Sequence, residues 1–106
     1  MMGEVIRLPI NFIGKLDQRR LEIFGGHMLA TGRATSWQWD LNDQGADMFS
    51  VYTGATNKKL AAWIERDQTL SRFRGYDGLG RIIAEGPIYE VIFTMDKFFK
   101  KLHGNR

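Results

Sequence analysis

Cysteine is absent from this sequence, and histidine and proline are scarce, with two of each. Without thiols the chain cannot form a disulfide framework, a thiolate zinc site or a cysteine nucleophile. His27 and His103 are too few for a histidine-rich metal site. The serines lack the Gly-x-Ser-x-Gly context of a nucleophile elbow. The sequence therefore predicts no catalytic residue, no metal site and no cofactor site, and we expect a protein that is not an enzyme.

Long apolar runs are missing as well. The longest are only a few residues, against the roughly 20 that a membrane-spanning helix needs. Near the N-terminus, Glu4 and Arg7 interrupt the stretch that would have to form the apolar core of a signal peptide. The lack of cysteine also fits a reducing compartment. We therefore expect no membrane association and a cytoplasmic location.

The charge that is present is mixed in sign. Lysine and arginine total 15 and aspartate and glutamate 12, which gives a net charge of +3. Because acids and bases are interspersed, charge alone gives little support for a nucleic-acid partner. The length of 106 residues and the hydrophobic fraction of 43% are typical of one globular domain, and no repeat or linker divides it. We treat residues 1–106 as a single domain.

Hydrophobic periodicity predicts a mixture of strands and helices. Trp37, Trp39 and Leu41 alternate with polar residues, which indicates a half-buried strand. Apolar residues recur at helical spacing from Ile88 to Leu102 and predict a long C-terminal helix. The predicted elements, in order, are a strand over residues 4–12, a helix over 17–31, strands over 36–41 and 46–53, a helix over 57–68, strands over 70–76 and 81–84, and a helix that begins at Pro87.

Two turn-like stretches have some features of ligand-binding loops. Asp40, Asp43 and Asp47 surround Asn42, but they lack the spacing and the closing glutamate of a calcium loop. Residues 75–80 are rich in glycine, but they lack the Gly-Lys-Ser/Thr of a P-loop and the glycine spacing of a dinucleotide fingerprint. Both stretches therefore favour turns between strands.

Basic residues are interleaved with aromatic residues between positions 58 and 76. Arg72 and Arg74 share one face of their predicted strand, with Tyr76 beyond them, and such a surface can bind a single-stranded nucleic acid. The interpretation that we favour is a solvated sheet edge whose cationic side chains discourage aggregation. With the basic residues of the preceding predicted helix, the candidate interaction surface comprises Lys58, Lys59, Arg66, Arg72, Arg74 and Tyr76.

The stretch from Ala46 to Tyr52 resembles the central strand of response-regulator receiver domains, in which an aspartate begins the strand and the phosphoacceptor aspartate ends it. Residues 85–88, followed by an amphipathic helix, are similar to the Lys-Pro step into the last receiver helix. In outline the resemblance extends over residues 5–102. It implies an α/β fold in which a single compact receiver-like sheet is flanked by about three helices.

The residues that a receiver needs for phosphorylation are replaced in this chain. Tyr52 stands at the phosphoacceptor position, and Gly86 stands at the position of the conserved lysine. Residues 9–11 end the predicted first strand without the acidic pair that holds Mg²⁺, so no acyl phosphate can form. The resemblance therefore implies a pseudo-receiver, a signalling module that cannot be phosphorylated.

The short link between the predicted strands at 36–41 and 46–53 favours a different sheet. About five residues suffice for a hairpin, whereas a parallel crossover usually needs a dozen or more. The alternative fold is therefore an α+β ferredoxin-like βαββαβ arrangement with a C-terminal helix.

Two functions are compatible with these observations. The leading prediction is a non-catalytic protein-interaction module that docks another protein through its final helix and the neighbouring strand, and a homodimer is also compatible with the sequence. The alternative is a small basic nucleic-acid-binding protein that uses the surface around Arg72, Arg74 and Tyr76. The first follows from what the receiver resemblance implies.

Overall fold

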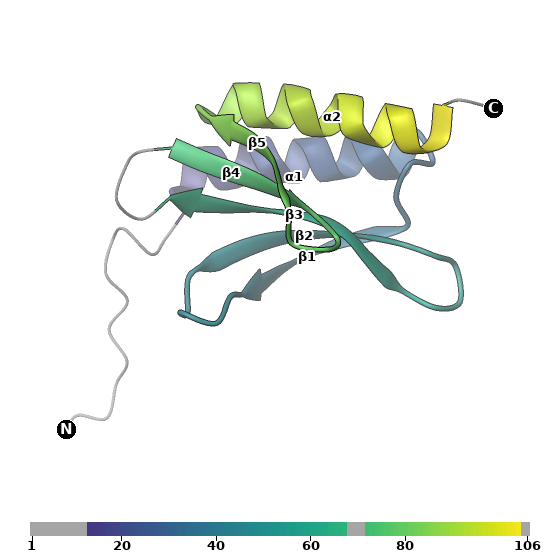
Figure 1. Ribbon diagram of the computed structural model, residues 1–106, viewed down its shortest axis with the longest axis horizontal. Coiled ribbons are helices and arrows are strands. Elements are labelled where there is room, and N and C mark those ends of the chain that lie inside the picture. Colours follow the sequence, from purple (N-terminus) through teal and green to yellow (C-terminus); the bar gives the residue numbers. More distant parts are fainter. Residues whose placement is uncertain (1–12, 68–71, 105–106) are drawn as a thin grey trace.

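The computed structural model describes residues 13–67 and 72–104. Its elements are α1 (Lys15–Ala30), β1 (Ser36–Leu41), β2 (Asp47–Thr53), β3 (Lys59–Asp67), β4 (Arg72–Asp77), β5 (Ile82–Gly86) and α2 (Ile88–Gly104). The five strands form one antiparallel sheet in the order β1-β2-β3-β4-β5. Helices α1 and α2 lie side by side and cover one face of this sheet (Figure 1). We call the opposite face, which neither helix covers, the open face.

The receiver-like fold is wrong. The described residues form two helices and an antiparallel sheet, whereas a receiver-like sheet would be flanked by about three helices. The ferredoxin-like alternative is also wrong, because residues 59–67 form strand β3 where that fold needs a helix. The predicted first strand, over residues 4–12, lies outside the described residues.

Strand β3 is the element that sequence periodicity assigned to the wrong class. Trp63 and Ile64 fit a helical stripe, but they lie on opposite faces of a strand in the structure. Ile64 is fully buried beneath the helices, whereas Trp63 stacks on Tyr76 of β4. Backbone pairing with β2 on one side and β4 on the other satisfies the hydrogen-bonding groups of β3. This non-local pairing overrides the local helical pattern.

The remaining described elements agree with the sequence predictions within a few residues. Strands β1 and β2 form the antiparallel hairpin that their short link predicted. Asn42 closes it, because its Oδ1 accepts the backbone N–H groups of Gln44 and Ala46, both at 2.9 Å. Gly45 follows with a φ of 77°, which glycine adopts without strain. The aspartate-rich stretch around Asn42 is therefore a turn between two strands, as the sequence predicted.

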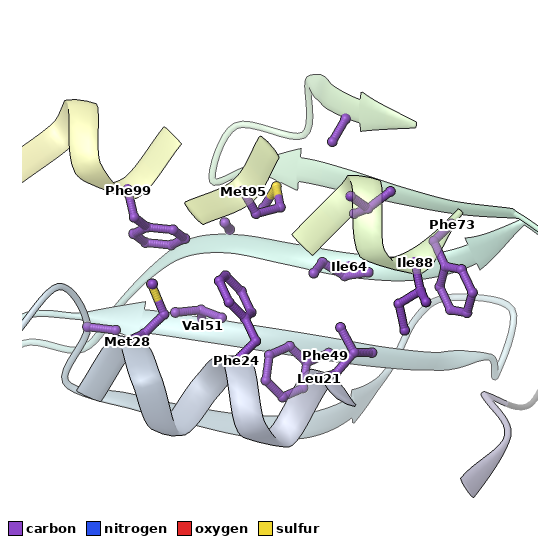
Figure 2. Close-up of a cluster of buried hydrophobic side chains, with 14 of the residues drawn as sticks. Leu21, Phe24, Met28, Phe49, Val51, Ile64, Phe73, Ile88, Met95 and Phe99 are labelled. Atoms are coloured by element: carbon purple, nitrogen blue, oxygen red, sulfur yellow. The ribbon is translucent and has the colours of Figure 1, made fainter. Parts of the chain in front are cut away.

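The core lies between the helices and the covered face of the sheet. Figure 2 shows side chains of both helices converging on side chains of the strands. Val91, Met95 and Phe99 are at most 1% exposed, which confirms these members of the stripe predicted for the last helix, whereas Leu102, also predicted to belong to it, is 56% exposed. The other large side chains that are less than 2% exposed are Ile13, Leu21, Met28, Phe49, Val51 and Ile64. Neither helix of the described chain has the length and apolarity to cross a membrane.

Gly25 allows α1 to lie close to the sheet. A Cβ at this position would come within 2.6 Å of Trp37 Cδ1 and 2.9 Å of Phe49 Cζ. These two rings pack beneath the helix with their centroids 5.3 Å apart. Glycine costs helical stability, about 1 kcal/mol relative to alanine. At this position the cost is offset by the close contact between helix and sheet.

Candidate functional site

The open face of the sheet carries basic residues predicted from the sequence, and acidic residues accompany them. Arg74 Nε donates to Glu85 Oε2 at 2.8 Å, and Arg74 Nη2 lies 3.1 Å from Asp67 Oδ2. The hydrogen bond with Glu85, and after it the hydrogen bond with Tyr76, raises the pKa of Arg74. Carboxylates of the protein itself therefore hold this guanidinium, which reduces its availability to a phosphate.

A polar hollow of about 420 Å³ brings Arg66, Arg74 and Tyr76 together. Its lining consists of Asn42, Gln44, Glu65, Arg66, Asp67, Arg74 and Tyr76. The lining carboxylates match the lining guanidinium groups, so the formal charges cancel. Arg72 is exposed on the same strand as Arg74 and pairs with Asp67 in the β3–β4 register. The basic residues at this end of the sheet therefore form no continuous positive stripe.

Lys58 and Lys59 lie at the other end of β3. Because Lys59 begins this strand and Asp67 ends it, a rise of about 3.3 Å per residue places them roughly 25 Å apart. The Lys58 Nζ atom lies 5.2 Å from the centroid of the Tyr52 ring. The structure thus separates these lysines from the arginines with which the sequence grouped them.

Asp40 and Tyr52 form a further polar pair on the open face, in which the Tyr52 hydroxyl donates to Asp40 Oδ2 at 3.2 Å. Burial raises the pKa of Asp40, but the polar side chains of Ser50, Gln38 and Tyr52 beside it outweigh burial and lower it. Burial, and then the charge of Asp40, raise the pKa of Tyr52. Both shifts lead away from neutral pH, so this pair is not tuned for acid–base catalysis.

A second surface lies on the outer side of the helix layer, where a groove of about 510 Å³ runs between α1 and α2. Ile23, Tyr89 and Phe93 line this groove and are 65%, 68% and 63% exposed. Leu16 is also 65% exposed and lies about two turns before Ile23 on α1, so it continues the same apolar row. The lining consists of Arg20, Ile23, Phe24, His27, Tyr89, Ile92, Phe93 and Asp96. We call this surface the helix groove.

One end of the helix groove is rich in positive charge. Asp96 Oδ1 lies 3.7 Å from His27 Nε2 and 3.5 Å from Arg33 Nη1. Its other oxygen, Oδ2, lies 3.2 Å from Lys100 Nζ. A single carboxylate is therefore shared among several basic groups at this end, and positive charge is in excess there.

The helix groove was not among the sequence predictions. Val91, Met95 and Phe99 form the buried stripe that periodicity identified, and Tyr89 and Phe93 fall outside it. An amphipathic helix needs only one apolar stripe to pack on a sheet. The two aromatic residues outside that stripe were therefore the signal in the sequence for a second apolar surface on this helix. The position of α1 beside α2, which completes the groove, had no local signal.

No family model, curated protein or solved structure matches the chain. Within residues 13–67 and 72–104, no cluster of three or more His, Asp or Glu side chains could hold a metal ion. The fold defines a two-layer protein in which helices cover one face of an antiparallel sheet.

Proposed function

We propose that this protein is a non-catalytic protein-interaction module that docks a partner through the helix groove. The observation that supports this most is the gathering of Ile23, Tyr89 and Phe93, each more than 60% exposed, around one groove. Exposed apolar side chains that are contiguous on a small protein mark a contact surface, because their exposure to water is unfavourable. The final helix, which the sequence predicted as the docking element, contributes two of the three. A cytoplasmic place of action belongs to the same proposal, since a chain without cysteine is compatible with a reducing compartment.

The open face gives less support to the alternative, a nucleic-acid-binding protein. Nucleic-acid affinity comes largely from basic side chains that neutralise phosphates. Arg74 is already paired with Asp67 and Glu85, and Lys58 and Lys59 lie at the far end of the sheet. The helix groove therefore carries the proposal, and the open face does not.

Site-specific photo-crosslinking tests this function. A benzophenone amino acid placed at Phe93, in cells that naturally express the protein, should give one discrete crosslinked product with another protein. The same probe at Leu79, which is 81% exposed in the turn between β4 and β5, is the matched control. We expect no discrete product from that position.

A second substitution makes the result specific to the groove. Ile23→Glu, placed in the chain that carries the probe at Phe93, introduces a charge on the opposite wall and should abolish the product. A product that persists in this variant, or one that forms equally from Leu79, would contradict docking at the helix groove.

A further inference from the structure

The helix groove has the features of a site for one particular kind of partner segment. Resting on the proposed function, we infer that it receives an amphipathic helix whose carboxylates lie against the basic end of the groove, around His27, Arg33 and Lys100.

The shape fits a third helix. Two helices lie side by side with a groove between them, and such grooves accept the apolar face of an added helix through anchors one turn apart. Phe24, which is 4% exposed, and the partly buried Ile92 form the floor. Ile23 and Phe93 stand on opposite walls. Its lining extends over about two turns of each helix, so at about 1.5 Å per residue the groove is roughly 10 Å long and holds about two turns of a partner helix.

The charge along the groove is asymmetric. At one end Asp96 is shared by His27, Arg33 and Lys100, as described above. Lys97 adds a further cation there, with its Nζ 4.9 Å from the centroid of the Phe93 ring. Carboxylates of a bound helix at this end would gain charge-assisted contacts with these groups and would keep basic partners away.

The opposite end of the groove is balanced in charge. Arg20, which lines it, pairs with Asp17 at 2.9 Å. An acidic partner helix would find no comparable excess of positive charge there, so its acidic residues should be concentrated at one end. This asymmetry sets the register of the helix in the groove.

A second copy of the chain offers a poor complement to this basic end from its own helix layer. The carboxylate of Glu22 accepts a hydrogen bond from Trp39 Nε1 at 2.8 Å, and Asp17 is paired with Arg20. In the two helices together, lysine and arginine outnumber aspartate and glutamate. A symmetric dimer through this layer would therefore bring excess positive charge together.

Two designed peptides of the same shape and opposite charge test which charge the groove prefers. Both have about 16 residues and the same leucine face, and their polar faces carry glutamate in one and lysine in the other. Fluorescence anisotropy with the full chain at about 50 mM salt should show the glutamate peptide binding at least about tenfold more tightly. The advantage should shrink at about 500 mM salt, where the Debye length is short.

Substitutions in the chain assign this preference to the groove. The double variant K97E/K100E should abolish or reverse the preference for the glutamate peptide, whereas Lys59→Glu, an exposed site on the sheet, should leave it unchanged. Phe93→Ser should weaken both peptides by a similar factor. Circular dichroism should show that all of these variants are folded, because every substituted side chain is exposed.

The outcomes distinguish this inference from the proposed function. Equal or tighter binding of the lysine peptide would overturn the acidic partner, while docking at the groove would stand if Phe93→Ser still weakened binding. Binding of neither peptide would overturn the helical partner, and the crosslink from Phe93 would then decide the function separately. A reversible dimer in sedimentation velocity that Phe93→Ser abolishes would make a second copy the occupant and would also overturn the inference.

Discussion

The two faces of the sheet come from the same strands and differ in their chemistry. On the covered face, Phe49 and Ile64 are fully buried against the helices. On the open face, Trp63 stacks on Tyr76 with 5.0 Å between ring centroids, and ion pairs surround Arg74. The helices exclude water from one face, so the hydrophobic effect dominates there, whereas open-face residues must cover their apolar parts with one another and pair their charges.

The same contrast applies to the two sides of the last helix. Phe99 faces the sheet and is fully buried, whereas Phe93 faces the helix groove and is 63% exposed. Residue type alone does not decide which of these phenylalanines serves the fold. The neighbouring layer decides it, and it follows that truncating either side chain should have very different consequences.

The largest predicted effect is that of Phe99→Ala. Removing a buried phenyl ring leaves a cavity between α2 and the sheet, and we expect the free energy of unfolding to fall by about 3–5 kcal/mol. Chemical denaturation followed by circular dichroism measures this loss. Because small domains have a total stability of about 5–15 kcal/mol, the transition should move to much lower denaturant concentration.

Phe93→Ala is the matched control on the same helix. The Phe93 side chain is mostly exposed, so we expect its truncation to change the free energy of unfolding by no more than about 0.5 kcal/mol. A loss as large as that of Phe99→Ala would contradict this comparison, because Phe93 would then belong to the core and would not be available for docking.

The contrast between these two sides of a helix could be predicted only in part from the sequence. The buried stripe of α2 extends over several turns, so its periodicity was sufficient to identify the helix and the burial of Phe99. In β3, Trp63 on the open face and Ile64 on the covered face are both apolar, so alternation was hidden. The pairing of β3 with β2 and β4 is non-local, and no local pattern could report it.

The candidate site was still less accessible to sequence reasoning. The basic residues from Lys58 to Arg74 were grouped because they are near one another in the sequence, and the extended form of β3 separates them. The helix groove depends on residues distant in the sequence, as the contact between Arg33 and Asp96, separated by 63 positions, illustrates. Only the folded chain brings the two walls of the groove together.

On the open face, we expect an effect smaller than that of Phe99→Ala. Trp63→Ala should lower the free energy of unfolding by about 1–2 kcal/mol. The indole is only partly buried, but the variant loses the stack on Tyr76 and the hydrogen bond from Trp63 Nε1 to Glu65 Oε2 at 2.8 Å. Urea denaturation of Trp63→Ala, Tyr76→Ala and the double variant measures the coupling between the rings. We expect a coupling of about 0.5–1.5 kcal/mol.

Trp63→Phe sharpens this prediction, since it keeps an aromatic ring and removes the indole N–H. Its loss should be clearly smaller than that of Trp63→Ala if the ring stack matters more than the hydrogen bond. A loss for Trp63→Ala as large as that for Phe99→Ala would show that the open face is itself a core surface covered by something else, and the contrast between the two faces would fail.

The last prediction concerns the pH dependence of stability and rests on Asp77, which lies opposite Ala62 in the β3–β4 register at the end of the covered face. Its Oδ1 accepts the backbone N–H groups of Leu79 and Arg81 at 2.9 and 3.0 Å, and Arg81 Nε lies 2.9 Å from Oδ2. The hydrogen bond from the Arg81 backbone, and then the Arg81 side chain, lower the pKa of Asp77 against the opposing effect of burial.

Since the folded pKa of Asp77 lies below the unfolded value of about 3.9, the charged carboxylate stabilises the fold above that value, and this contribution is lost as the pH falls through the folded pKa. Asp77→Asn keeps the acceptor oxygen, as Asn42 does in the other hairpin, and removes the titration. Denaturation between about pH 7 and pH 2 should therefore show a shallower acid-side loss of unfolding free energy for this variant than for the parent.

Asp43→Asn removes a negative charge from an exposed turn position and controls for net charge. If its curve were as shallow as that of Asp77→Asn, the effect would come from the overall charge, and the buried hydrogen bonds of Asp77 would have no special part in it.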